Sequence, residues 1–247
     1  MNLPASEVLA FTVSHGDRAY LADCVADMRA SSGYWFDWGV WLGAPSPQAE
    51  SVAKDLLAHP SRLGIQYLTV WDENRGQHHA TAEAIALAKE RGYRWLLRID
   101  DDMRGKTKRW LKKMLERAEH IKQTAKDERY RFVFGPVIKG LRNPIEAFAV
   151  LDKPKDVHAV FVPVMGGGCR LHPMELLEDY PVPLYEALGR GDPDALSAHV
   201  ASKEGALVRF EDIRLVHRTD ELEKAEGPEL AHARQMGWYW PYLGRAA

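Results

Sequence analysis

The 247-residue chain has little of several features that would directly indicate a class of protein. It has only 2 cysteines, Cys24 and Cys169, too few for a disulfide framework and at a spacing that fits no zinc motif. Neither charge dominates, since 33 basic and 35 acidic residues give a net charge of −2. The chain as a whole therefore lacks the basic field that would favour nucleic acid or an anionic membrane as a partner.

Long hydrophobic runs are missing as well. No stretch approaches the roughly 20 apolar residues of a membrane-spanning helix, and no basic segment precedes an apolar run as in a signal peptide. We therefore expect no membrane span and a cytoplasmic protein with reduced thiols. The composition, 46% hydrophobic and 28% charged, is that of an ordinary globular protein and argues against disorder.

The first hundred residues alternate strand-like and helix-like segments. Short apolar runs rich in β-branched and aromatic residues predict strands over 9–14, 38–42, 65–71 and 95–99. Segments with apolar residues at helical spacing predict helices over 17–30, 48–57 and 81–91. Such alternation is typical of an α/β fold, with a mostly parallel central sheet flanked by helices.

The second half of the chain is less regular. We expect a basic, amphipathic helix over 104–126, strands over 132–138 and 158–164, a short helix over 173–178 and a helix over 193–202. No internal repeat and no linker divides the chain, so the sequence predicts one domain.

Polar residues gather where the predicted strands end. The chain reads Ser14-His15-Gly16-Asp17 after the first strand, Asp72-Glu73-Asn74-Arg75-Gly76 after the third and Asp100-Asp101-Asp102 after the fourth. Ligands of parallel α/β sheets bind outside the carboxyl ends of the strands. We therefore expect the functional site at this edge.

The three consecutive aspartates call for a cation. Like charges about 4 Å apart cost about 1 kcal/mol even in water, and carboxylate oxygens select Mg²⁺, Ca²⁺ or Mn²⁺. On an extended chain the first and third residues point the same way, so Asp100 and Asp102 can face one ion while Asp101 faces away. A solvated acidic turn, paired with Arg104 or Lys106, is the alternative.

An ordered set of features leads from the third strand to the triplet. Asn74-x-Gly76 precedes a helix in which Ala80, Ala84 and Ala88 recur every fourth residue, and the next strand ends in Asp100-x-Asp102. This set resembles the GT-A glycosyltransferases, especially the family 2-like branch, over residues 7–103. The resemblance is looser over 132–218 and does not include the tail.

The resemblance implies one GT-A-like domain over 1–247 that transfers a sugar from a nucleotide-diphosphate donor to an acceptor hydroxyl. Its nucleotide-sugar-binding half would be 1–103, its acceptor side 104–218 and its C-terminal tail 219–247. Asp102 would bind Mn²⁺ or Mg²⁺, helped by Asp100, with His217 as a further ligand. Such an ion acts as a Lewis acid towards the leaving diphosphate.

The resemblance also implies a base and donor contacts. Glu211-Asp212 resembles the acidic pair of the family, so we expect Asp212 to take the acceptor's proton in an inverting reaction, with Glu211 in reserve. The expected donor-binding residues are Ser14, His15, Asp17, Asp72, Asn74, Arg75, Gly76, Asp100, Asp101, Gly167 and Gly168. The second strand ends without the acidic residues that the family has there. The sequence therefore does not predict which nucleotide base the sugar donor carries.

The segment 104–126 is locally basic, with nine Lys or Arg residues against two Glu. Two interpretations are open: a solvated helix face whose apolar side packs on the sheet, or a guide for a polyanionic acceptor such as nucleic acid with a modified base. The acceptor stays open: a glycan, a small molecule or a modified base in nucleic acid.

Two other functions fit the same pattern. A nucleotidyltransferase can share the α/β architecture and also needs a metal, although it normally carries a glycine-rich basic loop after the first strand. A non-catalytic module would bind a nucleotide sugar without turnover.

Overall fold

A computed structural model describes residues 6–14, 21–43, 51, 54–56, 58, 64–73, 75–124, 131–139, 149–150, 159–162, 165, 168–180, 199, 203 and 205–218. The strands are β1 Val8–Ser14, β2 Asp37–Leu42, β3 Ile65–Val70, β4 Trp95–Ile99, β5 Met103–Gly105, β6 Phe132–Lys139, β7 Ala149–Val150, β8 Ala159–Val162, β9 Cys169–Pro173 and β10 Ala206–His217. The helices are α1 Leu21–Ser32, α4 Gly76–Arg91, α5 Trp110–Thr124 and the short 3-10 helix η1 Met174–Leu176.

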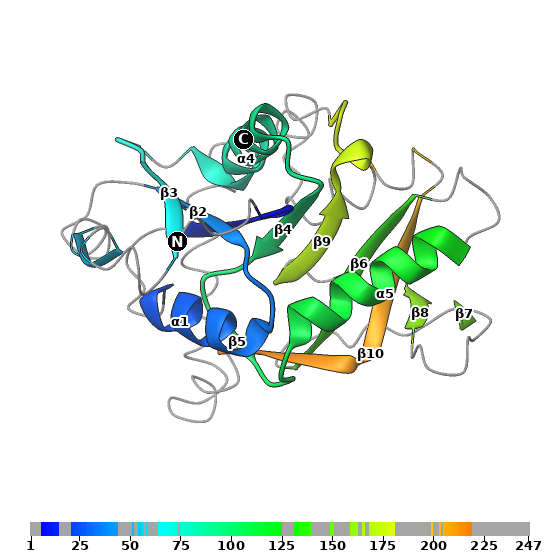
Figure 1. Ribbon diagram of the computed structural model, residues 1–247. Helices are drawn as coiled ribbons and strands as arrows, with labels where there is room; N and C mark the ends of the chain where they lie inside the picture. Colours follow the sequence, from blue (N-terminus) through cyan, green and yellow to red (C-terminus); the bar gives the residue numbers. More distant parts are fainter. Residues whose placement is uncertain are drawn as a thin grey trace, which may run out of the picture.

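These strands form a single sheet in the order β3-β2-β1-β4-β9-β6-β10-β8-β7, with β5 paired to β10 (Figure 1). The part β3-β2-β1-β4 is entirely parallel, so its carboxyl ends lie at one edge. β9 is antiparallel to β4 and β6, β6 and β10 are parallel, and β8 is antiparallel to β10. The α/β fold class expected from the sequence is confirmed.

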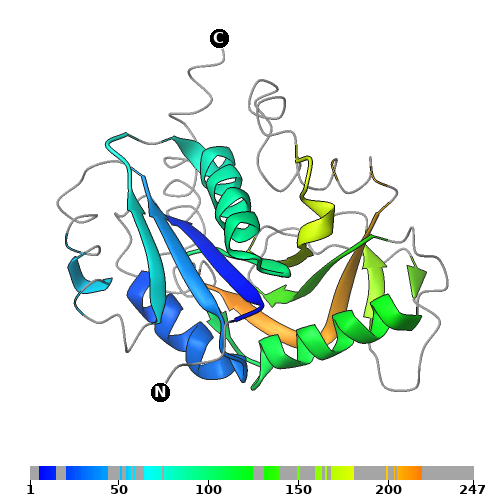
Figure 2. The same ribbon diagram turned by 45° about the horizontal axis from the view of Figure 1, so that its top comes forward.

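Helices cover both faces of the sheet (Figure 2). On one face, α1 and α5 pack in a core that includes Val8, Ala10 and Leu97. On the other face, α4 and η1 pack in a core that includes Leu9 and Phe11. Successive residues of β1 enter different cores because side chains alternate along a strand, and a sheet covered on both sides needs apolar residues at both positions.

The first four predicted strands agree with the structure to within one residue at each end. The helix predicted over 104–126 is wrong at its beginning: Met103–Gly105 forms β5, and α5 begins only at Trp110. The reason is a distant partner, since β5 pairs antiparallel with residues 215–217 of β10. The helices expected over 48–57 and 193–202 lie largely outside the described residues.

Helix α4 begins five residues before its predicted start and lies on the sheet through alanines. Ala80, Ala84 and Ala88 are fully buried and share a core with Leu9 and Phe11 of β1. Small side chains on one helix face allow the backbone to approach the sheet closely, so this face leaves little room for larger residues.

We expect Ala84→Leu to lower the free energy of unfolding by about 1–3 kcal/mol, because the added carbons overpack this interface. Ala86→Leu, on the exposed side of the same helix, is the matched control and should change stability by less than about 0.5 kcal/mol. Urea unfolding followed by circular dichroism measures both. Equal effects of the two substitutions would contradict the close packing.

His172 of β9 is a buried titratable group of the sheet. It is 1% exposed, and its Nδ1 donates to the carbonyl oxygen of Leu96 at 3.3 Å. Burial, assisted by the charge of Arg170, lowers the pKa of His172 to about 3. The same side chain titrates near 6.5 in an unfolded chain. Below that pH the unfolded state therefore binds a proton that the folded state does not, and acid destabilises the fold.

From pH 6 to pH 4, His172 is expected to lower the free energy of unfolding by up to about 1.4 kcal/mol per pH unit. His172→Asn keeps an N–H donor for the Leu96 carbonyl but does not titrate, so its stability should decrease less steeply over this range. Urea unfolding at pH 6, 5 and 4 compares the two proteins. Parallel pH profiles would rule out this role of His172.

Candidate functional site

Four segments meet at the carboxyl edge of the sheet: the end of β1, the first half of α1, the turn between β4 and β5, and the end of β10. In that turn the N–H of Met103 donates to the carbonyl of Asp100 at 3.4 Å. The pairing of β5 with β10 aligns His217 with Met103. The N–H of Arg218 then donates to the carbonyl of Asp102 at 3.0 Å. The end of the last strand is thus attached to the acidic triplet.

The carboxylates of the triplet point to different partners. Arg98 of β4 donates through Nε and Nη2 to Asp100 Oδ1, both at 3.1 Å. Ser14 Oγ donates to Asp101 Oδ2 at 2.7 Å in a buried hydrogen bond. The prediction that Asp100 and Asp102 share one side of an extended chain is wrong in its geometry, because residues 101 and 102 form a turn. The proposed role of Asp100 in metal binding stays a prediction.

Asp102 and His217 form the pair best suited to hold a metal ion. Asp102 Oδ1 lies 3.1 Å from His217 Nε2, and the two side chains are 9% and 13% exposed. Two adjacent ligands of an octahedral ion, each bound at about 2.1 Å, are also about 3 Å apart. Within the described ranges, no group of three or more His, Cys, Asp or Glu residues is suited to a metal. Magnesium-like ions complete their coordination with water and substrate phosphates, so two protein ligands suffice.

Arg98 is a site residue that the sequence analysis missed. It is buried in β4, and its Nη2 also lies 3.4 Å from Gln77 Oε1 in the first turn of α4. Arg98 therefore connects Asp100 to the start of α4. The signal was present in the sequence, because Arg98 precedes Asp100 by two residues and the two side chains of a strand at this spacing share a face.

Helix α1 contributes two further contacts that the sequence analysis missed. Cys24 Sγ donates to the carbonyl of Asp100 at 3.4 Å. Burial, followed by the charge of Asp101, raises the pKa of this thiol well above its ordinary value. Asp23 Oδ2 accepts from Nη2 of the buried Arg218 at 3.0 Å. Both contacts join segments far apart in the chain, so no local pattern indicates them.

The expected donor-binding residues around the start of α4 are open to solvent. Asp72 and Arg75 are exposed, and Arg75 precedes the helix without a capping hydrogen bond from its side chain. Gly76 has a φ of 81°, which a glycine adopts without strain. The first turn of α4 contains no acidic residue. The N–H groups and the dipole at such a helix start favour an anion.

Gly168 lies against the triplet through its backbone. Its carbonyl accepts a hydrogen bond from the N–H of Asp100 at 2.9 Å, and a Cβ at this position would lie 2.9 Å from Met103 Sδ. The glycine thus allows a close approach to the protein's own core. The other expected donor contacts, His15, Asp17, Asn74 and Gly167, lie outside the described residues.

The expected base, Asp212, lies beside α5. Arg117 Nη2 donates to Asp212 Oδ2 at 2.6 Å, and Nη1 donates to Oδ1. Asp212 falls where the register of β10 with β6 shifts, between Phe210 and Arg214. His217 follows five residues later, which is about 16 Å along an extended strand. The structure therefore does not place Asp212 next to the Asp102–His217 pair.

Glu211, the reserve base, forms an ion pair with a residue of the same strand. Arg209 Nε donates to Glu211 Oε1 at 2.6 Å. Each of the two carboxylates therefore accepts a hydrogen bond from an arginine, Asp212 from Arg117 of α5 and Glu211 from Arg209 of β10. Their assignment as general bases stays a prediction.

The strand order and the parallel half of the sheet define a class of fold. It is a GT-A-like fold, which confirms the resemblance at the level of the fold. No protein-family model matches the sequence, and no curated protein matches it.

Three solved structures illustrate the likeness. Mannosyltransferase PcManGT from Pyrobaculum calidifontis, in complex with GDP-Man and Mn²⁺, has a TM-score of 0.55 at 16% identity, covering 87% of this chain and 57% of its own. S. aureus TarS 1–349 in complex with UDP has a TM-score of 0.54 at 12% identity, covering 87% and 62%. The nucleoside-diphosphate-sugar pyrophosphorylase from Vibrio cholerae RC9 has a TM-score of 0.51 at 12% identity, covering 85% and 94%. The chain therefore spans less than two thirds of PcManGT and of TarS 1–349.

The ion pair of Asp212 with Arg117 predicts an effect on stability as well as any effect on activity. Asp212→Asn is expected to lower the free energy of unfolding by about 1–2 kcal/mol, because Arg117 loses its charged partner in a partly buried position. Arg117→Met should cost a similar amount, and the double variant should cost less than the sum of the two. Additive effects in urea unfolding would show that the pair is not coupled.

Proposed function

We propose that the protein is a metal-dependent glycosyltransferase that moves a sugar from a nucleotide-diphosphate donor to an acceptor hydroxyl. The observation that carries the proposal is the 3.1 Å approach of Asp102 Oδ1 to His217 Nε2 at the carboxyl edge of a GT-A-like sheet. PcManGT, which shares the fold, was solved with GDP-Man and Mn²⁺, and TarS with UDP.

The residues of the edge take different parts in this proposal. Asp102 and His217 hold Mn²⁺ or Mg²⁺, and Asp100 assists from the start of the turn. The ion, when bound, offsets the negative charge that develops on the leaving diphosphate. Arg98 keeps Asp100 oriented, and the exposed start of α4 receives phosphate oxygens through its N–H groups.

Asp212 remains the proposed base, with Glu211 in reserve. A general base must have a carboxylate oxygen available to accept the proton, and in this structure both oxygens of Asp212 accept hydrogen bonds from Arg117. Acceptor binding then has to bring the hydroxyl to this carboxylate, or Glu211 performs the step. In an inverting reaction the carboxylate takes the hydroxyl proton as the acceptor oxygen displaces the diphosphate.

A nucleotidyltransferase is the second candidate, and one observation favours it. The chain covers 94% of the Vibrio cholerae pyrophosphorylase, whereas it covers 57% of PcManGT. The same edge of the sheet would then join a nucleoside triphosphate to a sugar phosphate. The two candidates differ in their products, a nucleoside diphosphate in one case and pyrophosphate in the other.

Thermal unfolding in the presence of nucleotide diphosphates and their sugars, with and without Mn²⁺, tests the shared requirement for metal and nucleotide. A ligand at 100 times its dissociation constant stabilises the fold by about 2.7 kcal/mol. We expect one nucleotide series to stabilise the protein only with Mn²⁺, and Asp102→Asn to abolish this shift. Glu90→Gln, at an exposed position, is the control and should leave the shift unchanged.

Product analysis separates the candidates. Release of a nucleoside diphosphate from the sugar nucleotide supports the transferase, and formation of pyrophosphate from a nucleoside triphosphate and a sugar phosphate supports the nucleotidyltransferase. Binding without either product supports the non-catalytic module. A nucleotide shift that is independent of Mn²⁺ and unchanged in Asp102→Asn would overturn the metal site.

A further inference from the structure

The basic segment 104–126 is not a uniform helix face. Three of its cations have carboxylate partners: Lys112 with Glu116 at 3.8 Å, Lys122 with Glu175 at 2.5 Å, and Arg117 with Asp212. These pairs lie along the length of α5. These three paired cations are explained by an ordinary solvated helix face.

Four other cations at the start of α5 form a basic cluster: Lys106, Lys108, Arg109 and Lys113. None of them forms an ion pair with a carboxylate of the described residues. Lys106, Lys108 and Arg109 are exposed and Lys113 is half-buried. Positive charge is therefore concentrated in the basic cluster, although the chain as a whole has a net charge of −2.

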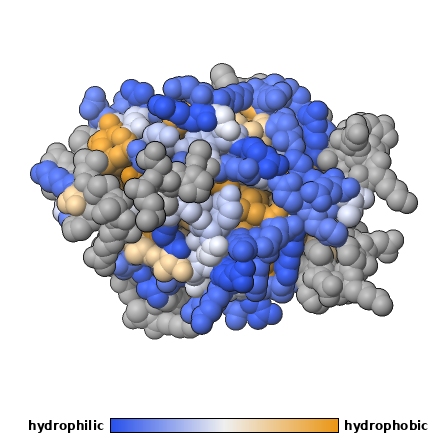
Figure 3. Space-filling view, in the orientation of Figure 1, coloured by the Kyte–Doolittle hydropathy of each residue, from blue (hydrophilic) through white to orange (hydrophobic). Residues whose placement is uncertain are grey.

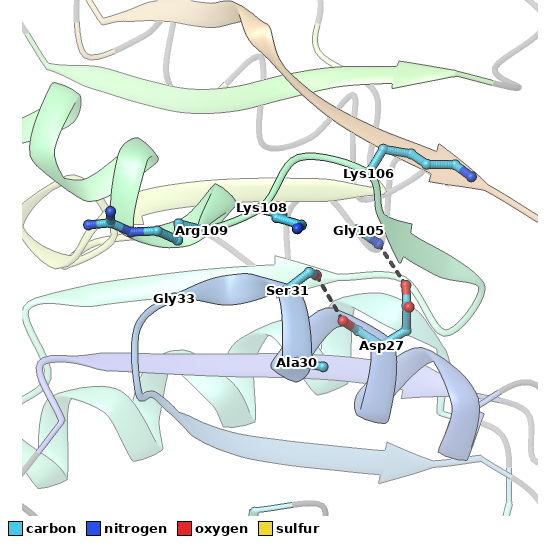
Figure 4. A pocket seen from close by; sticks show the side chains of 8 residues that line it. All are labelled: Asp27, Ala30, Ser31, Gly33, Gly105, Lys106, Lys108 and Arg109. Carbon is cyan, nitrogen blue, oxygen red and sulfur yellow. Dashed lines mark hydrogen bonds between the residues drawn. The ribbon is translucent and has the colours of Figure 1, made fainter.

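The basic cluster borders a pocket of about 480 Å³ (Figure 4). The loop that carries Lys106, Lys108 and Arg109 forms one wall, and the second half of α1 forms the other. Asp27 is the carboxylate of this pocket, and its Oδ2 accepts a hydrogen bond from the N–H of Gly105 at 2.9 Å. Ser31 Oγ donates to the carbonyl of Asp27 at 2.8 Å. The first of these bonds joins the two walls, and the second lies within α1.

Arg109 is held in position by a close contact with the end of α1. Its φ is 59°, a left-handed conformation that costs a non-glycine residue about 1 kcal/mol or more. Gly33 lies directly against it, since a Cβ at Gly33 would come within 2.6 Å of Arg109 Cβ. Packing against Gly33 thus fixes the backbone conformation of Arg109, whose side chain is exposed to solvent.

We propose that the basic cluster binds the phosphodiester backbone of nucleic acid. Lysine and arginine side chains on a surface attract successive phosphates and release their counterions. Lys106 follows Asp102 by four residues, so the two residues lie at most about 13 Å apart. Phosphates of one DNA strand are about 3.4 Å apart along the helix axis, so a strand bound by the cluster reaches the carboxyl edge within a few nucleotides.

An anionic membrane is a poorer match for this surface. A membrane-binding face combines cations with large apolar side chains that insert between lipids. Among the described residues, the exposed large hydrophobics are Trp35 and Val70, and neither belongs to the basic cluster. The side of the molecule in Figure 3 is mostly hydrophilic, with apolar residues in small separate patches. None of the described helices is long and apolar enough to cross a membrane.

Nucleic-acid binding needs neither sugar donor nor metal, so it is tested independently of the proposed function. Fluorescence anisotropy of a labelled 20-nucleotide DNA, single-stranded and duplex, is measured with EDTA between 50 and 200 mM NaCl. The test variant carries Lys106→Gln, Lys108→Gln, Arg109→Gln and Lys113→Gln. The control carries Lys89→Gln, Arg91→Gln, Lys122→Gln and Lys203→Gln, which changes the net charge equally. Circular dichroism and thermal unfolding establish that both variants are folded.

We expect the wild-type protein to bind DNA and the cluster variant to bind at least about tenfold more weakly, with the control unchanged. The slope of log affinity against log salt should decrease by about 0.7 per lost contact for single strands and about 0.9 for duplex. Equal weakening in both variants, or wild-type affinity in the cluster variant, would overturn the proposal. Cluster-dependent binding to phosphatidylserine vesicles without binding to DNA would also overturn it, in favour of a membrane.

A second variant tests the position of Arg109 without changing any charge. Gly33→Ala places a methyl group against Arg109, so it should displace this cation and weaken DNA binding several-fold. Gly92→Ala is the control, because Gly92 has a similar φ of 73° but no atom within 4 Å of the added carbon. Identical DNA binding of the two glycine variants would contradict the assigned role of Arg109.

Discussion

The antiparallel pairing of β5 with the last residues of β10 is the contact on which the rest of the site depends. It joins residues 103–105 to 215–217, more than a hundred positions apart in the chain. The pairing turns the backbone after Asp102 away from the direction of β4 and brings His217 to the carboxylate of Asp102. This pairing therefore sets the 3.1 Å contact between Asp102 and His217, the two residues proposed as metal ligands.

The negative charges of Asp100, Asp101 and Asp102 are stabilised by neighbouring side chains of the protein. Each aspartate of the triplet has a separate partner: Arg98 for Asp100, Ser14 for Asp101 and His217 for Asp102. Such partners reduce the repulsion that three adjacent carboxylates would otherwise experience in a partly buried place. The triplet is therefore tolerable in the folded protein before any ion binds, and it can be held in a defined geometry.

The sequence was most informative where structure depends on local pattern. The apolar runs of β1 to β4 and the alanine face of α4 could be recognised because a buried strand and a close-packed helix each impose a simple periodicity. The start of α5 could not be recognised in this way. Residues 103–105 form their backbone hydrogen bonds with β10 and not within a helix. The extended geometry assumed for Asp100 to Asp102 failed for a related reason, since the chain turns there to begin β5. The contacts of Asp212 with Arg117 and of Cys24 with the triplet depend on packing between distant segments, which no local pattern encodes.

Helix α1 touches both regions to which a role is assigned. Its first half carries Asp23 and Cys24, beside Arg218 and the triplet, and its second half carries Asp27 and Ser31, in the wall of the pocket. An α-helix rises 1.5 Å per residue and is stiff over this length, so Asp23 and Ser31 are held about 12 Å apart along its axis. The two regions therefore share one rigid element, which sets the spacing between them.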